Sequence, residues 1–163
     1  MLLLIAVVLF SPITSVLVVV YVVQPVKVEG TAMAPTLNDE DRIFIGKQIG
    51  QLERGDIVVF YFPLDTSKSF LMRIIALPGE KIRLDADGQL NINDLPVSES
   101  YLSAERNRHP RRIPEQTLDS DSYWMMGDNR DASNDSRSFG PVPRRLIYGK
   151  VMMRYWPLGQ PLK

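Results

Sequence analysis

The chain begins with a long apolar stretch and continues with short runs in which apolar and polar residues alternate. Residues 2–23 carry no charged side chain. A stretch of this length can cross a hydrocarbon core of about 30 Å as a helix. Pro12 lies mid-segment, where a membrane helix tolerates a kink, and Tyr21 lies near one end, where an interfacial aromatic is expected. We therefore expect residues 1–23 to form a single-pass membrane anchor in contact with the lipid bilayer.

A cleavable signal peptide and a buried soluble helix are the alternatives for this stretch. A signal peptide has an apolar core of about 7–15 residues after a basic start. Residues 2–23 form a longer run, and no lysine or arginine precedes it. Ala32-Met33-Ala34 imitates a cleavage site, but it lies well beyond the apolar run and Pro35 follows it. Lys27 is the only base close to the stretch, so local charge does not orient it in a membrane.

Beyond residue 24 the pattern changes to short β-prone segments separated by turn residues. Apolar runs end at Pro63 and at Pro78-Gly79, and Asp87-Gly88 marks a hairpin. No long segment in this part shows a sustained helical period, so residues 24–163 are expected to form a mainly β domain, a partly closed barrel or folded sheet. The expected strands are 57–62, 70–76, 81–84, 90–93, 123–126 and 151–155.

The charge balance narrows the classes of partner. Lysine plus arginine and aspartate plus glutamate both number 19, so we expect no nucleic-acid partner. The segment 105–112 is locally basic, and we expect a solvated loop rather than a contact with anionic lipid or a partner. His109, the one histidine, lies in this segment and is expected at the surface, which leaves no histidine metal cluster.

Five methionines have two interpretations, as strand core or as an apolar surface near the bilayer. Alternation along a strand places half of its residues on each face, so we expect about three of the five in the core. They are Met33, Met125, Met126, Met152 and Met153.

Four sequence blocks in a fixed order carry the most specific information. They cover residues 28–37, 54–60, 70–80 and 127–140, and 90–97 is a weaker fifth. Together they resemble the type I signal peptidases, which are membrane-anchored serine proteases with a Ser/Lys dyad. The resemblance spans nearly the whole chain. It implies the signal-peptidase fold, with its β domain on the extracytoplasmic side of a bacterial-type inner (cytoplasmic) membrane.

The resemblance places the nucleophile at Ala32 and the general base at Met72. A methyl group cannot attack a carbonyl, and methionine copies the length of lysine without its titratable amine. Thr31 is adjacent to Ala32, but successive side chains of an extended chain point oppositely, and the same holds for Arg73 beside Met72. Lys68 is expected to be solvated and protonated. None of the three is a good replacement for the dyad.

Other positions of the family site remain. The resemblance makes Ser133 the partner of the lost lysine, so we expect its hydroxyl to bond to backbone or water. It makes Asp135 and Arg137 a structural ion pair that supports the site, as Arg73 does from the third block. Glycine at Gly30 cannot supply the hydroxyl that some members use for the oxyanion. The expected substrate groove consists of Gly30, Thr31, Met33 and Pro35.

The aspartates of the fourth block could be misread as a calcium loop. Asp128, Asp131 and Asp135 have a superficially suitable spacing, but the glycine and terminal glutamate of an EF-hand are absent. We expect no metal and no cofactor.

Three functions follow from these observations. The first is a noncatalytic signal peptidase homologue that binds an extended polypeptide or serves as a subunit of a membrane-protein complex. The second is a signal peptidase I, a serine endopeptidase that removes signal peptides from exported preproteins, carrying inactivating substitutions. The third is a protease that uses unrecognised residues, which is disfavoured because His109 lies in a loop.

Overall fold

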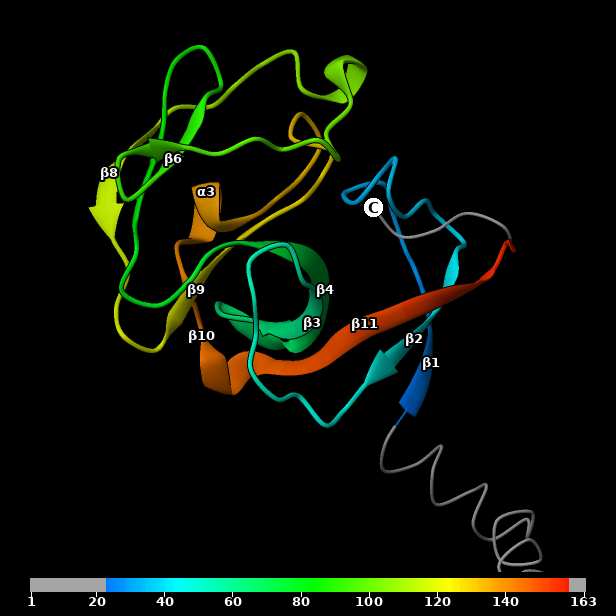
Figure 1. Cartoon of the computed structure of the whole chain (residues 1–163). Helices are drawn as coiled ribbons and strands as arrows, with labels where there is room; N and C mark the ends of the chain where they lie inside the picture. Colours follow the sequence, from blue (N-terminus) through cyan, green and yellow to red (C-terminus); the bar gives the residue numbers. More distant parts are fainter. Residues whose placement is uncertain (1–22, 159–163) are drawn as a thin grey trace, which may run out of the picture.

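Two antiparallel sheets make up residues 23–158, the part of the chain that the computed structural model describes. The larger sheet is seven-stranded, in the order β1-β2-β11-β3-β4-β9-β10 (Figure 1). Its strands are β1 (Val23–Lys27), β2 (Arg42–Gly46), β3 (Ile57–Phe62), β4 (Asp65–Ala76), β9 (Ser122–Met126), β10 (Val142–Pro143) and β11 (Ile147–Trp156).

The smaller sheet is four-stranded, in the order β7-β6-β5-β8. Its strands are β5 (Lys81–Leu84), β6 (Leu90–Ile92), β7 (Leu95–Pro96) and β8 (Ile113–Thr117). Three short helical turns lie in the connections: η1 (Ala104–Arg106), α3 (Ser136–Phe139) and η2 (Arg144–Leu146).

Strand β4 links the parts of the fold that surround the site. It pairs with β3 so that Met72 lies opposite Val58, and it pairs with β9 from Arg73 to Ala76. The run 57–62 forms the neighbouring strand β3. Its four consecutive apolar residues, 57–60, are buried, as expected of a strand covered on both faces. Met72 packs in the core cluster that also contains Val58 and Phe60. The β3–β4 hairpin is therefore a paired and buried element beside which the loops of the site lie.

The mainly β architecture is confirmed, and all six predicted strand regions contain a strand. The division into two sheets was not predicted, and five strands were missed: β1, β2, β7, β8 and β10. Strand β8 is polar and mostly exposed, with one buried residue, so it lacks the alternation that identifies a half-buried strand. Among the methionines the expectation is confirmed, because Met33, Met125 and Met126 are buried whereas Met152 and Met153 are 59% and 53% exposed.

The predicted anchor lies outside the described residues, except that β1 begins at Val23, its last residue. Within residues 23–158, none of the helices has the length and apolar character needed to cross a bilayer.

Candidate functional site

A groove of about 560 Å³ is lined by both Ala32 and Met72, the two positions predicted to correspond to the dyad. Ala32 lies on one wall and Met72 on another, so residues from opposite parts of the sequence meet in one cavity. Gly30, Thr31 and Met33 also line the groove, whereas Pro35, predicted with them, is exposed and is not part of the lining. The rest of the lining comes from 26–29, Val59, 69–71, Ala132, Asn134 and Tyr148.

The Ala32 loop is a series of turns rather than an extended segment. The N–H of Ala34 donates to the carbonyl of Thr31 at 3.1 Å, and the N–H of Leu37 donates to that of Met33 at 3.0 Å. The prediction that the side chains of Thr31 and Ala32 point in opposite directions, as in an extended chain, was therefore made on the wrong backbone conformation. Gly30 has a φ of +84°, a conformation that favours glycine over the hydroxyl residues of some family members.

The loop after β9 holds the Ala32 loop by two hydrogen bonds from one residue. The N–H of Asn129 donates to the Ala32 carbonyl at 2.9 Å, and its side-chain amide donates to the Thr31 carbonyl at 3.1 Å. Gly127 permits this approach, because a Cβ there would collide with the Ala32 carbonyl oxygen and with Ser133 Oγ. The position of Ala32 is thus fixed from the fourth sequence block.

Ser133 has a hydroxyl that is buried and, among residues 23–158, without a hydrogen-bond partner. We expected this hydroxyl to bond to backbone or water, and the backbone alternative was wrong. A buried hydroxyl left without any hydrogen bond costs on the order of 1–3 kcal/mol. The site therefore retains a polar group without the partner for which the family uses it.

Arg73 and Asp128 form a buried ion pair next to the groove. Arg73 Nε donates to Asp128 Oδ1 at 2.9 Å, and Nη2 donates to Oδ2 at 2.7 Å. The side chains are 4% and 0% exposed. Arg73 Nη1 also donates to the Gly55 carbonyl, and the guanidinium lies 4.0 Å from the centroid of the Tyr101 ring. Arg73 thus points away from Met72, as predicted.

A second buried pair joins the loop after β7 to the same segment. Arg130 donates to both carboxylate oxygens of Glu99, and its Nε donates to the Gly127 carbonyl at 3.0 Å. Burial opposes the charge on Arg130, but the hydrogen bond and charge of Glu99 outweigh it, so the pKa of Arg130 is raised. Burial, and then the negative charge of Glu99, raise the pKa of the Tyr101 hydroxyl.

The third pair is the one that the resemblance implied. Arg137 Nε and Nη2 donate to the two oxygens of Asp135, both at 2.8 Å, and the side chains are 4% and 0% exposed. Asp135 also accepts from the N–H of Gly127 at 3.3 Å. The aspartates once considered as a calcium loop are therefore engaged by protein donors, since Asp131 accepts from the N–H groups of Arg108 and His109.

The groups that could replace the dyad lie in unsuitable places. Thr31 is exposed, and the Lys68 side chain is 64% exposed and paired with Asp65 at 2.9 Å. The His109 side chain is 85% exposed, which confirms its surface position. Nucleophilic catalysis needs a hydroxyl or thiol activated by a neighbouring base. The side chains of Ala32 and Met72 themselves supply neither group.

Sequence reasoning missed several residues that shape the site. Asn129, Gly127, Glu99 and Tyr101 hold or contact its walls, but each acts on a partner far away in the sequence. The one signal available was the position of Gly127 and Asn129 inside the fourth sequence block. Glu99 and Tyr101 lie outside all the blocks.

Comparison with known proteins identifies the family of the chain. A family model described as "Signal peptidase, peptidase S26" matches residues 1–156. Signal peptidase IB of Staphylococcus aureus is 31% identical over 158 residues, which cover 86% of this chain and 81% of the relative. Signal peptidase I of Leptolyngbya laminosa is 34% identical over 142 residues, with 79% and 66% covered.

A solved structure is also similar. The crystal structure of a signal peptidase I from Enterococcus faecalis superimposes with a TM-score of 0.57 at 31% sequence identity. The match covers 64% of this chain and 100% of that chain.

Proposed function

Because the chain belongs to the signal peptidase family, peptidase S26, we propose that it is a noncatalytic member that holds an extended polypeptide without cleaving it. One observation carries this proposal. The two positions that bear the dyad in the family line the same groove, and they are an alanine and a methionine. The groove is retained while the reacting atoms are not.

The groove has the features that a bound strand requires. Strand β4 pairs with β9 only from Arg73 onward, and residues 69–72 line the groove on the side before that pairing begins. Residues 26–31 form the facing wall. An extended polypeptide between these two segments could add main-chain hydrogen bonds, as in strand addition to a sheet edge. Apolar side chains such as Val59 and Leu71 would then contact alternate residues of the ligand.

The cellular setting is proposed from the family and the sequence together. Residues 1–23 serve as a single membrane anchor, and residues 24–163 form the β domain on the extracytoplasmic side of a bacterial-type inner membrane. In this setting the ligand is an exported preprotein or another membrane-associated polypeptide. The chain acts as a peptide-binding or assembly subunit of a membrane-protein complex.

The alternative is a signal peptidase I that cleaves preproteins once its substitutions are reversed. Ser133 favours this alternative. Its buried hydroxyl has no hydrogen-bond partner in the described residues, so it is available to bond a lysine introduced at position 72. The fixed position of Ala32 is a second indication. This alternative concerns the scaffold, and it predicts no cleavage by the chain as it stands.

Reversion separates the two possibilities. The full chain, Ala32→Ser, Met72→Lys and the double variant are reconstituted in liposomes with a preprotein that carries an Ala-x-Ala site. We expect binding without cleavage by the original chain and by both single variants. Cleavage by the double variant would show that the scaffold is competent, and its absence would indicate that the groove has diverged toward binding alone. Cleavage by the original chain would overturn the proposal.

The subunit role has a separate test. Extraction in mild detergent followed by size-exclusion chromatography and mass spectrometry should show a partner or a bound polypeptide. Migration solely as a free monomer would contradict the assembly role and leave the peptide-binding role to the reconstitution experiment.

A further inference from the structure

A cluster of unpaired arginines lies beside the groove, in the segment that was expected to be an ordinary solvated loop. Residues 105–112 contain four arginines and one glutamate. The side chains of Arg106, Arg108 and Arg112 are exposed, and none has an ion pair or hydrogen bond within residues 23–158. The fourth, Arg111, donates to the neutral hydroxyl of Ser138 at 3.0 Å. We call residues 105–112 the arginine loop.

The arginine loop is held in place rather than free. Asp131 accepts from the N–H groups of Arg108 at 2.9 Å and His109 at 3.0 Å, and its own N–H donates to the Arg106 carbonyl at 3.1 Å. The side-chain oxygen of Asn107 accepts from the N–H of Arg130 at 3.2 Å. These bonds fix the backbone of residues 106–109 beside Asp131, so less of the chain has to become ordered when a partner binds.

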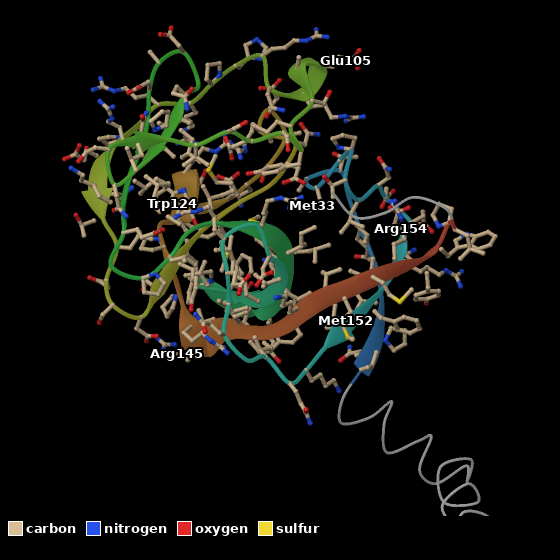
Figure 2. The ribbon with its side chains drawn as sticks, in the orientation of Figure 1. Met33, Glu105, Trp124, Arg145, Met152 and Arg154 are labelled. Atoms are coloured by element: carbon tan, nitrogen blue, oxygen red, sulfur yellow. The ribbon has the colours of Figure 1, made fainter. Side chains whose placement is uncertain are left out.

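The residues that hold the arginine loop continue directly into the groove. Asp131 is followed by Ala132, which lines the groove, and the N–H of Ala132 donates to the carbonyl of Asn129, the residue that fixes Ala32. η1, whose last two residues begin the arginine loop, is found at the same end of the molecule as the Ala32 loop (Figure 1). Figure 2 shows Glu105 at this end, above Met33, and Met152 on β11 well away from it.

The charge of the groove itself is nearly balanced. Lys27 on the groove wall pairs with Glu40 at 2.8 Å, and Glu29 adds a negative charge. Positive charge exceeds negative charge at the Ala132 end, where the arginine loop lies. The four arginines of the loop are accompanied by three carboxylates, Glu105, Asp131 and Asp87, the last of which lines a second cavity with Arg108. A ligand complementary to this distribution is neutral in the groove and acidic where it leaves it.

We propose that the arginine loop is a subsite for an acidic stretch of the polypeptide that lies in the groove. This inference rests on the proposed function and specifies its ligand class: a chain with a small or apolar segment adjoining a run of aspartates or glutamates. The guanidinium groups of Arg106, Arg108 and Arg112 bind the carboxylates, as arginine forks do when geometry allows two parallel hydrogen bonds.

An anionic membrane surface is the competing occupant, and the placement of the loop disfavours it. Under the proposed anchor, the bilayer lies at the start of β1. That point is at the opposite end of the molecule from η1 (Figure 1). Attraction to anionic lipid falls off within a Debye length of about 8–10 Å.

The test measures peptide binding to the full chain in nanodiscs of neutral lipid by fluorescence anisotropy. The first peptide has an Ala-x-Ala core with a run of glutamates on one side, a second has the run on the other side, and matched peptides have glutamines instead. We expect one glutamate peptide to bind about tenfold more tightly than its glutamine match at low salt. The preference should vanish at about 1 M salt, where the Debye length is about 3 Å.

Variants assign the preference to the loop. Arg106→Gln/Arg108→Gln/Arg112→Gln should abolish the preference and leave the affinity for the glutamine peptides unchanged. The corresponding lysine variant keeps the charges and should retain most of the preference. A control of Lys47→Gln/Arg145→Gln removes two exposed positive charges that lie neither in the arginine loop nor in the groove lining, and it should change nothing. Thermal unfolding of each variant checks that it is folded.

The outcomes distinguish the inference from the proposed function. Equal binding of glutamate and glutamine peptides, or a preference that survives the triple glutamine variant, overturns the subsite and leaves the proposed function intact. If no peptide binds, both fail. Capture of the nanodiscs by anionic vesicles, lost in the glutamine variant and accompanied by no peptide preference, assigns the loop to lipid and also overturns the inference.

Discussion

The backbone N–H of Asn129 lies 2.9 Å from the carbonyl oxygen of Ala32 and donates a hydrogen bond to it. Through this bond, the loop after β9 holds Ala32, the position that the resemblance assigns to the nucleophile. Two residues earlier in the same loop, Gly127 faces the Ala32 carbonyl and Ser133 so closely that a side chain would collide with both. The groove therefore depends on the absence of a Cβ at position 127.

Gly127→Ala should destabilise the domain by about 1–3 kcal/mol, because the added methyl forces the two loops apart. The free energy of unfolding in urea measures this change. Gly50→Ala is the matched control, since a Cβ at Gly50 would meet nothing within 4 Å, and it should lie within about 0.5 kcal/mol of the original chain. Equal stability of the two variants would contradict the close approach at Gly127.

Removal of one partner of the buried Arg73–Asp128 pair should lower the free energy of unfolding more than removal of one partner of an exposed pair. Arg73→Met leaves the carboxylate of Asp128 buried and uncompensated, since that side chain is 0% exposed, and should cost about 3–5 kcal/mol. Lys68→Met removes an exposed partner of Asp65 and should cost at most about 1 kcal/mol. Urea unfolding of both variants measures the two losses of stability. Similar losses would mean that the buried pair contributes no more than a surface pair.

Met72→Lys should make stability depend on pH. Met72 is 3% exposed, and burial disfavours the ammonium form, so the folded-state pKa of a lysine there should fall below its ordinary value of about 10.4. The unfolded chain then binds more protons than the folded one, and stability rises with pH between the two pKa values. The free energy of unfolding of this variant, measured from neutral to alkaline pH, should increase relative to the original chain. A parallel dependence in the two proteins would refute the prediction.

In that background, Ser133 should stabilise the lysine as a hydrogen-bond partner. Ser133→Ala should therefore destabilise Met72→Lys more than it destabilises the original chain, in which the buried hydroxyl has no partner among the described residues. The coupling energy from this double-mutant cycle is the relevant measurement, and a value near zero would place the two side chains out of contact.

Tyr101 should stay protonated in alkaline solution. Burial and the charge of Glu99 raise the pKa of its hydroxyl, so the folded protein retains this proton as exposed tyrosines ionise. The folded-state absorbance change of tyrosine ionisation should thus be the same for the original chain and Tyr101→Phe. In denaturant the variant should show one tyrosine fewer. A smaller change in the folded variant would indicate that Tyr101 titrates normally.

Local sequence patterns predicted much of the sheet but little of its connections. The apolar run of β3 and the turn at Asp87-Gly88 gave their elements directly, because burial on both faces and hairpin geometry leave a local signature. Strand β8 left none, because it is paired with β5 while exposing most of its side chains. Its existence depends on a partner remote in sequence.

The site likewise has features that could be predicted from the sequence and features that could not. The substituted dyad positions and the Asp135–Arg137 pair came from the resemblance, and the structure contains that ion pair. The bond from Asn129 to Ala32 and the cluster of Glu99, Tyr101 and Arg130 depend on tertiary placement, which spacing along the chain does not encode. That the hydroxyl of Ser133 has no partner could not be anticipated either, because it depends on which donors and acceptors lie within hydrogen-bond distance in the folded chain.

We propose that the groove binds a polypeptide and does not cut it. The most direct measurement is the equilibrium between the original full chain, reconstituted in liposomes, and an Ala-x-Ala preprotein with a photocrosslinker in its expected groove segment. Intact-mass analysis and peptide mapping then follow both the preprotein and the crosslinked product. Binding without cleavage predicts crosslinks to the groove walls, at 26–31 or 69–72, and a preprotein of unchanged mass. A shortened preprotein, or crosslinks confined to surfaces outside the groove, would contradict it.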